Sequence, residues 1–312
     1  MSFLNKKIYV AGHKGMVGSA ILKQLENKGC SNLVLKTRQE LDLKNNEAVC
    51  NFFSTEKPDI VILAAARVGG ILANINFPAE FLYENLMIQN NVIHNAYLHN
   101  VEKFCFLGSS CVYPKDCNEL IKEGDLLKGP LEPTNEGYAL AKITGLKMIE
   151  YYKSQFGFNG VSLMLCNLYG TDDSFDLKNA HVLSSLVKKV VDASDQNENE
   201  VILWGTGVAR REFMHVHDAA SAILHLLDLD TSYDLINLGI GEDISILELA
   251  KKIISIVGFK GKITFDKTKS DGMFRKCLDV TRMKNLGFTP QISLDHGISK
   301  TINEYINIKR QF

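Results

Sequence analysis

The sequence has no excess of charge of either sign and no long hydrophobic run. Among its 312 residues, 35 Lys and Arg stand against 36 Asp and Glu, which gives a formal net charge of −1. No basic surplus therefore points to a nucleic acid or an anionic membrane as partner. The longest apolar run, residues 60–66, is too short to cross a bilayer. A strand pattern begins by Lys7, so we expect no signal peptide.

The sequence also lacks cysteines in pairs that suit a zinc site or a disulfide framework. It has seven cysteines, which is an odd number, and no CxxC sequence. We therefore expect neither structural disulfides nor a metal site. Such cysteine usage is typical of the reducing cytoplasm, where most cysteines serve as small core residues.

Internal repeats and low-complexity tracts are absent, and the first half instead alternates strands with helices. Its strand segments are apolar without alternation, as expected of strands buried on both faces. Strand–helix alternation of this kind predicts an α/β fold with a Rossmann-type, doubly wound parallel sheet. The predicted strands are residues 7–11, 33–36, 60–65, 103–108 and 161–165, and the predicted helices are residues 18–28, 46–54, 81–100 and 138–156.

The pattern changes after Gly170. A polar stretch is followed by a predicted helix at 181–193, a strand at 201–204, a helix at 218–227 and a sixth strand at 233–238. Short helices and strands mix from residue 244 onward. We therefore expect a Rossmann domain over residues 1–170, with a return near 212–240, and a smaller α/β substrate domain over residues 171–211 and 241–312.

Three glycines follow the first predicted strand with the spacing GxxGxxG. They are Gly12, Gly15 and Gly18, and a predicted helix comes directly after them. Glycines at this turn let backbone N–H groups approach a pyrophosphate, and the helix start adds partial positive charge. The alternative is a plain glycine-rich turn. The position of the three glycines at the first strand-to-helix junction favours a dinucleotide site instead.

Basic residues stand at the end of the second predicted strand, where an NAD site often has a carboxylate. The residues there are Lys36, Thr37 and Arg38. Arg38 can pair with a 2′-phosphate, and Lys14 in the glycine loop could join it, so the sequence favours NADP over NAD. The alternative is that both are solvated surface cations.

A candidate catalytic set consists of a tyrosine and a lysine on one helix and a serine at a strand end. Tyr138 and Lys142 are four residues apart, which places them on one helix face. We expect the ammonium to lower the pKa of the phenol. Ser109 follows the fourth strand at its carboxyl end, where ligands bind in open α/β sheets. Together these groups can donate a proton during reduction of a ketone.

Several stretches together resemble the extended short-chain dehydrogenases, and among these most closely the GDP-L-fucose synthase family. They are GHKGMVGSA, LGSSCVYP, EPTNEGYALAK, NLYG, WGTGVARREF and REFMHV, and the resemblance returns at residues 269–282. The activity it implies uses NADPH to convert GDP-4-keto-6-deoxy-D-mannose to GDP-L-fucose, by 3,5-epimerisation and then 4-keto reduction. Lys14 departs from the pattern, because many relatives carry Arg there, and this loses a bidentate fork.

The resemblance assigns Cys111 and His181 as the acid/base pair that inverts C3 and C5. Ser109 and Tyr138 would bind the C4 oxygen. Without the resemblance, Cys111 would be taken as a buried filler and His181 as a helix cap. The cofactor-binding residues it implies are Gly12, Lys14, Gly15, Met16, Val17, Gly18, Arg38, Ala65, Leu107, Gly108, Ser109, Lys142, Leu165, Cys166, Asn167, Leu168 and His181.

The same resemblance implies how the substrate and a second subunit bind. It assigns the GDP-sugar to Lys189, Trp204, Arg211 and Asp271, although Trp204 could equally be a core residue of the smaller domain. It also implies a homodimer in which helices 81–100 and 138–156 form a four-helix bundle. Residues 67–71 are expected to form a flexible loop at the active site.

Two other functions remain open at this point. One is an NAD-dependent nucleotide-sugar 4-epimerase or 4,6-dehydratase of the same family, against which Arg38 and Cys111 count. A dehydratase would also place an acidic residue close after Ser109, where the sequence has none. The other is a nucleotide sensor without catalysis, which would usually have lost the tyrosine or the lysine.

Overall fold

The computed structural model describes residues 3–117, 119–176, 180–229, 231–268 and 272–310. Its largest element is a six-stranded sheet in which every neighbouring pair is parallel. The strand order is β10-β5-β4-β3-β1-β2. The strands are β1 (Ile8–Ala11), β2 (Leu33–Val34), β3 (Ile60–Leu63), β4 (Lys103–Ser109), β5 (Gly160–Leu165) and β10 (Leu235–Leu238).

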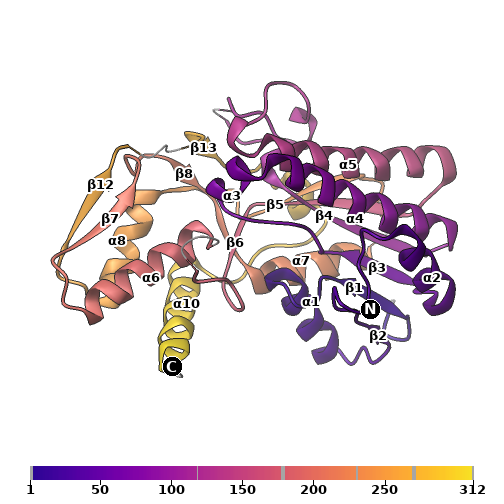
Figure 1. Cartoon of the computed structure of the whole chain (residues 1–312), viewed down its shortest axis with the longest axis horizontal. Coiled ribbons are helices and arrows are strands. Elements are labelled where there is room, and N and C mark those ends of the chain that lie inside the picture. Colours follow the sequence, from indigo (N-terminus) through magenta and orange to yellow (C-terminus); the bar gives the residue numbers. More distant parts are fainter. Residues whose placement is uncertain (1–2, 118, 177–179, 230, 269–271, 311–312) are drawn as a thin grey trace.

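Helices cover both faces of this sheet (Figure 1). One face carries α1 (Met16–Asn27) and α7 (Val216–Asp228), which pack on each other. The other carries α2 (Asn46–Glu56), α4 (Pro78–Leu98) and α5 (Glu136–Phe156), with α4 lying along α5. Strands β1 and β3 are buried throughout, which explains their apolar composition. The predicted doubly wound parallel sheet is confirmed.

The strand order reverses between β1 and β3. The chain runs from β1 outward to β2 and then crosses back to β3 on the other side of β1. Ligands in open α/β sheets bind beyond the carboxyl ends of the strands at such a switch point. The loops that follow β1 and β3 therefore define where a site is expected.

The remaining elements form a smaller body with its own hydrophobic cluster (Figure 1). Its helices α6 (Val182–Asp195), α8 (Ile246–Val257) and α10 (Leu294–Lys309) pack on one another. The short strands are β6 (Asn167–Tyr169) with β9 (Phe213–His215), β7 (Glu200–Trp204) with β12 (Lys262–Asp266), and β8 (Arg210–Arg211) between β11 (Ile244–Ser245) and β13 (Arg275–Lys276). Two short helices pack against the main body instead: α3 (Ile71–Asn76) contacts α4, and α9 (Thr281–Asn285) contacts β10.

Several predicted bounds differ from the structure. The second strand ends at Val34 rather than at residue 36, so Arg38 lies in a loop. Helix α4 begins at Pro78, three residues before the predicted start, because proline suits the first turn of a helix. The sequence predicts that the chain returns to the Rossmann domain near residues 212–240, and these domain bounds stay a prediction. Within the described residues, no helix is both long and apolar enough to span a membrane.

Candidate active site

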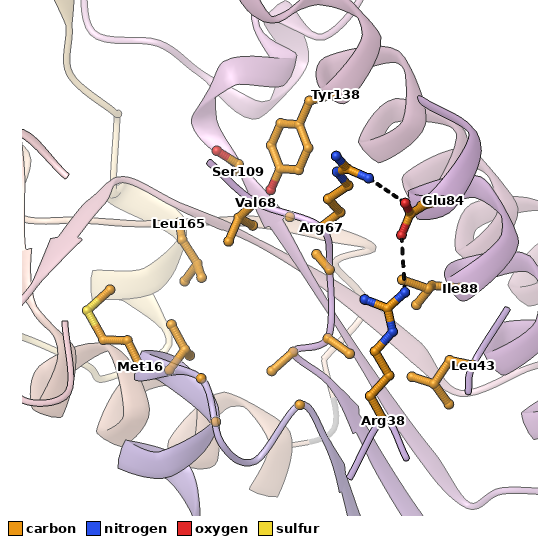
Figure 2. Close-up of a pocket in the computed structure, with 18 of the residues that line it drawn as sticks. Met16, Arg38, Leu43, Arg67, Val68, Glu84, Ile88, Ser109, Tyr138 and Leu165 are labelled. Atoms are coloured by element: carbon orange, nitrogen blue, oxygen red, sulfur yellow. Dashed lines mark hydrogen bonds and ion pairs between the residues drawn. The ribbon is translucent and has the colours of Figure 1, made fainter. Parts of the chain in front are cut away.

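A cavity of about 560 Å³ lies at the switch point, which is a size typical of small-molecule sites. The glycine loop after β1, the segment after β3 and the end of β5 form its walls, and Ser109, Tyr138 and His181 reach it from three other elements. Figure 2 shows Tyr138 and Ser109 at one end and Arg38 at the other, with Met16 and Leu165 between them on the opposite wall. The cavity therefore joins the predicted cofactor and catalytic residues.

The glycine loop packs so closely that two of its glycines cannot carry a side chain. Gly12 has a φ of +88°, and a Cβ there would lie 2.7 Å from the backbone nitrogen of Ala65. A Cβ on Gly18 would lie 2.1 Å from the carbonyl oxygen of Gly12. Helix α1 begins just after Gly15, and no side chain in the described part of the chain caps it. The N–H groups of its first turn can therefore serve a bound phosphate.

Arg38 stands at the far end of the cavity on an exposed side chain. Its guanidinium lies 3.8 Å from a Glu84 carboxylate oxygen, and the Lys44 ammonium lies 3.5 Å from the same oxygen. The pKa of Glu84 is lowered: burial opposes ionisation, but hydrogen bonds and charges from Arg67 and Lys44 favour it more. Arg38 thus belongs to a positive cluster that a carboxylate from α4 holds in place, as Figure 2 shows.

The segment after β3 is held by a salt-bridge network, although a flexible loop was expected there. Arg67 pairs with Glu80 at 2.6 Å and, more closely, with Glu84. Its backbone N–H donates to Asn85 Oδ1 at 2.9 Å, and Asn85 Nδ2 donates back to its carbonyl at 3.0 Å. The expectation of a loop to residue 71 was also too long, because α3 begins at Ile71.

Ser109, Cys111 and Tyr138 come together where β4 meets α5. The Cys111 thiol donates to Ser109 Oγ at 2.9 Å, and Ser109 also caps the short turn that carries Cys111. Cys111 is buried, with 7% of its surface exposed. Burial raises the pKa of Tyr138, and negative charge on Cys111 raises it further. The thiol and the phenol therefore lie within electrostatic reach of each other.

Lys142 does not lower the pKa of Tyr138 in this structure, so that prediction was wrong. The Lys142 ammonium donates to the Leu107 carbonyl at 2.9 Å and sits over the Phe106 ring, 4.7 Å from its centroid. Its distance to the Tyr138 ring centroid is 5.9 Å. Burial lowers the pKa of Lys142 to about 8. The four-residue spacing does place both residues on one face of α5, but the lysine points to the end of β4.

His181 is held by the carboxylate of Asp173, a residue that sequence reasoning did not single out. Its Nδ1 lies 3.0 Å from Asp173 Oδ1, and Ser184 donates to Asp173 Oδ2. The Asp173 side chain is 2% exposed and the His181 side chain 50%. The pKa of His181 is raised, chiefly by the hydrogen bond to Asp173, with burial opposing it. No motif or periodicity in the sequence links residues 173 and 181.

The residues assigned to the GDP-sugar lie outside the cavity lining, on the smaller body. Lys189 sits over the Trp204 ring, 5.5 Å from its centroid, and Trp204 is 48% exposed. Arg211 in β8 lies beside Lys276 in β13. Burial lowers the pKa of Lys276, and negative charge on Cys111 raises it, so this strand pair lies close to the catalytic end. Asp271 lies outside the described residues.

Most residues predicted for the cofactor do line the cavity. The exceptions are Lys14, which is exposed on the glycine loop, and Leu107 and Lys142, which lie behind Ser109. Sequence reasoning missed the outer wall, including Glu84, although Glu80 and Glu84 are spaced to share one helix face. The residues that line the cavity as predicted are Gly12, Gly15, Met16, Val17, Gly18, Arg38, Ala65, Gly108, Ser109, Tyr138, Leu165, Cys166, Asn167, Leu168 and His181.

Comparisons with known proteins match nearly the whole chain. The model of the NAD dependent epimerase/dehydratase family matches residues 8–239. The chain is 50% identical over 300 residues to a putative GDP-L-fucose synthase 2 of Arabidopsis thaliana, covering 96% of this chain and 92% of that protein. It is 46% identical to the GDP-L-fucose synthase of Escherichia coli, covering 98% of each chain. A GDP-L-fucose synthetase from Naegleria fowleri, solved with NADP bound, superposes with a TM-score of 0.88 at 26% identity, over 98% of this chain and 95% of that one.

Proposed function

We propose, since the chain belongs to the NAD dependent epimerase/dehydratase family, that it catalyses the GDP-L-fucose synthase reaction. The reaction inverts C3 and C5 of GDP-4-keto-6-deoxy-D-mannose and then reduces the C4 ketone with NADPH. The observation that carries this proposal is one cavity that holds groups for both kinds of chemistry. Ser109 and Tyr138 line it and serve reduction, and His181 lines it and serves proton transfer at carbon. Cys111 is not among the lining residues, but its thiol donates to Ser109 Oγ and so lies next to them.

The residues of the cavity fit NADPH, which when bound supplies the hydride for C4. The first turn of α1 would hold the pyrophosphate, because Gly12 and Gly18 allow the loop to close against β3. Arg38 would bind the 2′-phosphate, and the Glu84 carboxylate keeps the guanidinium near the cavity. Lys14 would add charge from the rim.

Epimerisation needs a base and an acid on opposite faces of the sugar. The C4 ketone acidifies the hydrogens on C3 and C5, and hydrogen bonds from Ser109 and Tyr138 to its oxygen stabilise the enolate. Cys111, as thiolate, removes a proton from carbon. The His181 imidazolium returns a proton to the other face and is left as neutral imidazole.

Reduction uses the same oxygen contacts. Tyr138 transfers its hydroxyl proton to the C4 oxygen as the carbonyl becomes an alcohol. Lys142 shares this face of α5 and would hold the nicotinamide ribose beside Tyr138.

We propose that the smaller body binds the nucleotide part of the substrate. Arg211 would pair with the diphosphate, and Trp204 with Lys189 would cover the nucleoside. Asp271 completes this proposed set. The two hydrophobic clusters support a division into a cofactor domain over residues 1–170 with its return near 212–240, and a substrate domain over residues 171–211 and 241–312. The exception is the segment of Leu278, Val280 and Met283, which packs in the cluster of the main sheet.

We also propose a homodimer through a four-helix bundle. Tyr83 on α4 is 63% exposed, and Leu140 and Tyr151 on α5 are 42% and 59% exposed. The two α5 residues are eleven apart, which places them on one face about three turns apart. Apolar side chains along two adjacent helices suit burial against the same pair of helices in a second copy.

We also propose a cytoplasmic location, which is supported by the seven cysteines, all of which are free.

The test is an assay with GDP-4-keto-6-deoxy-D-mannose and either NADPH or NADH. We expect NADPH to be oxidised faster than NADH, with GDP-L-fucose as the product. Tyr138→Phe should lower the rate of oxidation on the order of 100-fold or more. Cys111→Ser should lose exchange at C3 and C5 while NADPH still binds. Absence of NADPH oxidation, with NAD copurified in the enzyme, would instead indicate a 4-epimerase or 4,6-dehydratase.

A nucleotide sensor on the same fold is disfavoured by the intact catalytic set. Ser109, Tyr138 and Lys142 are all present and lie at the cavity or directly behind it. A sensor would retain its whole function as Tyr138→Phe, whereas we expect this variant to lose activity.

A further inference from the structure

Asp173 is a buried carboxylate that the reaction as described above does not use. It lies in the loop after β6, two residues before Phe175 and eight before His181. Its side chain is 2% exposed. A buried carboxylate needs hydrogen-bond donors, and Asp173 has three of them in the structure. The identity of these donors shows how it acts on the cavity.

Two of the three donors fix the carboxylate. The Ser174 backbone N–H donates to Oδ1 at 2.8 Å, and the Ser184 hydroxyl, on the first turn of α6, donates to Oδ2. A backbone N–H can only donate, so Oδ1 is an acceptor. The carboxylate thus has its orientation set by groups that are not part of the cavity lining.

The third donor is His181. Its Nδ1 lies 3.0 Å from the same Oδ1 that accepts from Ser174, so Nδ1 carries a proton and donates it. Half of the His181 side chain is exposed, and the residue lines the cavity. Nε2 is therefore the ring nitrogen that remains for the substrate.

We propose that Asp173 is a positioning residue for epimerisation: it holds His181 as the Nδ1–H tautomer and favours its imidazolium form, with Nε2–H as the proton donor to carbon. In the transfer the Nε2–H bond breaks, a C–H bond forms on the enolate, and the Nδ1–H bond to Asp173 is kept. This inference rests on the proposed function, in which His181 is the acid.

Other charged groups near the pair do not take over this role. Asp172 precedes Asp173, and its carboxylate accepts from Ser19 on α1. Glu304 on α10 accepts from the Asp172 backbone N–H at 3.0 Å. Lys188 on α6 pairs with Asp192 at 3.1 Å. The described contacts to the His181 ring come from Asp173, so the effect of Asp173→Asn can be separated from theirs.

Asp173→Asn is the direct test, because it removes the charge and keeps an oxygen that can accept from Nδ1. Deuterium incorporation at C3 and C5 is measured against pH in D₂O without NADPH. In the wild type the rate should fall as pH rises and the imidazolium is lost. In Asp173→Asn this fall should move to lower pH. At pH values above the fall, the exchange rate should be lower than that of the wild type by on the order of tenfold or more. Affinity for NADPH should stay unchanged.

Asp172→Asn is the matched control, since it removes the same charge one residue away and should leave the pH profile in place. A uniform loss of rate in Asp173→Asn, with no shift in pH, would mean a merely structural role and would overturn the proposal. An unchanged profile in an enzyme that still makes GDP-L-fucose would also overturn it, while the proposed function would stand.

A second measurement on the wild type does not depend on activity or on the folding of a variant. The full-length protein is labelled with ¹⁵N-histidine, and the His181 signals are assigned by their loss in His181→Gln. At high pH we expect the neutral ring as the Nδ1–H tautomer. An Nε2–H tautomer would refute the proposal, whether or not the enzyme makes GDP-L-fucose.

Discussion

At the scale of single residues, we propose that one guanidinium, that of Arg38, determines the choice of cofactor. Arg38 lies at the end of the cavity away from Tyr138, where the adenosine half would lie, and Glu84 and Lys44 surround it. A charge-assisted hydrogen bond to phosphate contributes more binding free energy than a hydrogen bond between neutral groups. Cofactor preference is thus separable from the chemistry at the other end.

We predict that Arg38→Ser weakens NADPH binding by about 10- to 100-fold, the loss of one hydrogen bond to a charged group. NADH lacks the 2′-phosphate, so its affinity should hardly change. Fluorescence titration with each cofactor measures both affinities. Lys28→Ser, at an exposed position outside the cavity lining, is the control. Equal weakening for both cofactors would show that Arg38 does not bind the 2′-phosphate.

Lys142 shows how a side chain kept for function can lower the free energy of unfolding. Its side chain is buried, and burial lowers its pKa to about 8 from 10.5. Below pH 8 the lysine is charged in both folded and unfolded states, so folding bears the full cost of burying the charge. Between 8 and 10.5 the unfolded state binds more protons, and the cost shrinks as pH rises.

We therefore predict that Lys142→Met raises the free energy of unfolding at pH 7 by about 2 kcal/mol, after allowance for the lost bond to Leu107. The gain should disappear as pH rises toward 10.5, and NADPH oxidation should be lost at every pH. Urea unfolding at a series of pH values checks this. A variant less stable than the wild type at pH 7 would show that the ammonium's contacts outweigh its burial.

Single residues also show where sequence reasoning ends. Tyr138, Ser109 and the glycines follow from local spacing, because a helix turn or a strand end fixes their placement. The contact between Asp173 and His181 joins an irregular loop to a helix start, and no period describes it. The direction in which Lys142 points depends on Phe106 and Leu107, which belong to another element.

At the scale of elements, the switch point between β1 and β3 creates the site. Short buried strands and glycine turns specify this part of the sheet, and the sequence predicted it well. Of the short strands of the smaller body, β7 was predicted at residues 201–204. Pairs such as β8 and β13 were not, because they have two residues each and show no alternation. Their pairing depends on contacts distant in the chain.

One carboxylate joins those short strands to the main sheet. Glu212, between β8 and β9, is 1% exposed and accepts from the backbone N–H groups of Ile240, Gly241 and Leu278 at 2.5, 2.6 and 3.0 Å. Ile240 and Gly241 follow β10, and Leu278 follows β13. Glu212 therefore holds the strand pair that carries Arg211 and Lys276 against the end of the main sheet.

We predict that Glu212→Ala lowers the free energy of unfolding by at least about 3 kcal/mol, because three buried donors lose their acceptor. Where the variant folds, its KM for the GDP-sugar should rise more than its KM for NADPH. Glu242→Ala, at an exposed position nearby, serves as the control in the same denaturation and kinetic measurements. If Glu212→Ala lost no more stability than Glu242→Ala, Glu212 would not hold the strand pair against the main sheet.

At the scale of the whole molecule, the outer faces of α4 and α5 are where a second subunit is proposed. Arg67 lines the cavity and pairs with Glu84 on α4, the helix that also carries Tyr83. The face proposed for dimerisation and a wall of the cavity therefore belong to one element.

We predict a dimer in light scattering at micromolar concentration, and a monomer for the double variant Leu140→Arg with Tyr151→Arg. Two buried guanidinium groups without partners would make the interface unfavourable. Lys122→Arg, on a different part of the surface, should stay dimeric. A wild type that is monomeric under these conditions would contradict the bundle.

The central claim is that one cavity performs two inversions and one reduction. It is tested most directly by running the reaction in D₂O with NADPH and determining where deuterium enters the product. We predict GDP-L-fucose with one solvent deuterium at each of C3 and C5 and with the C4 hydrogen derived from NADPH. A reduced product that carries no solvent deuterium at C3 and C5 would contradict the claim, because it would show a reductase that leaves both centres untouched.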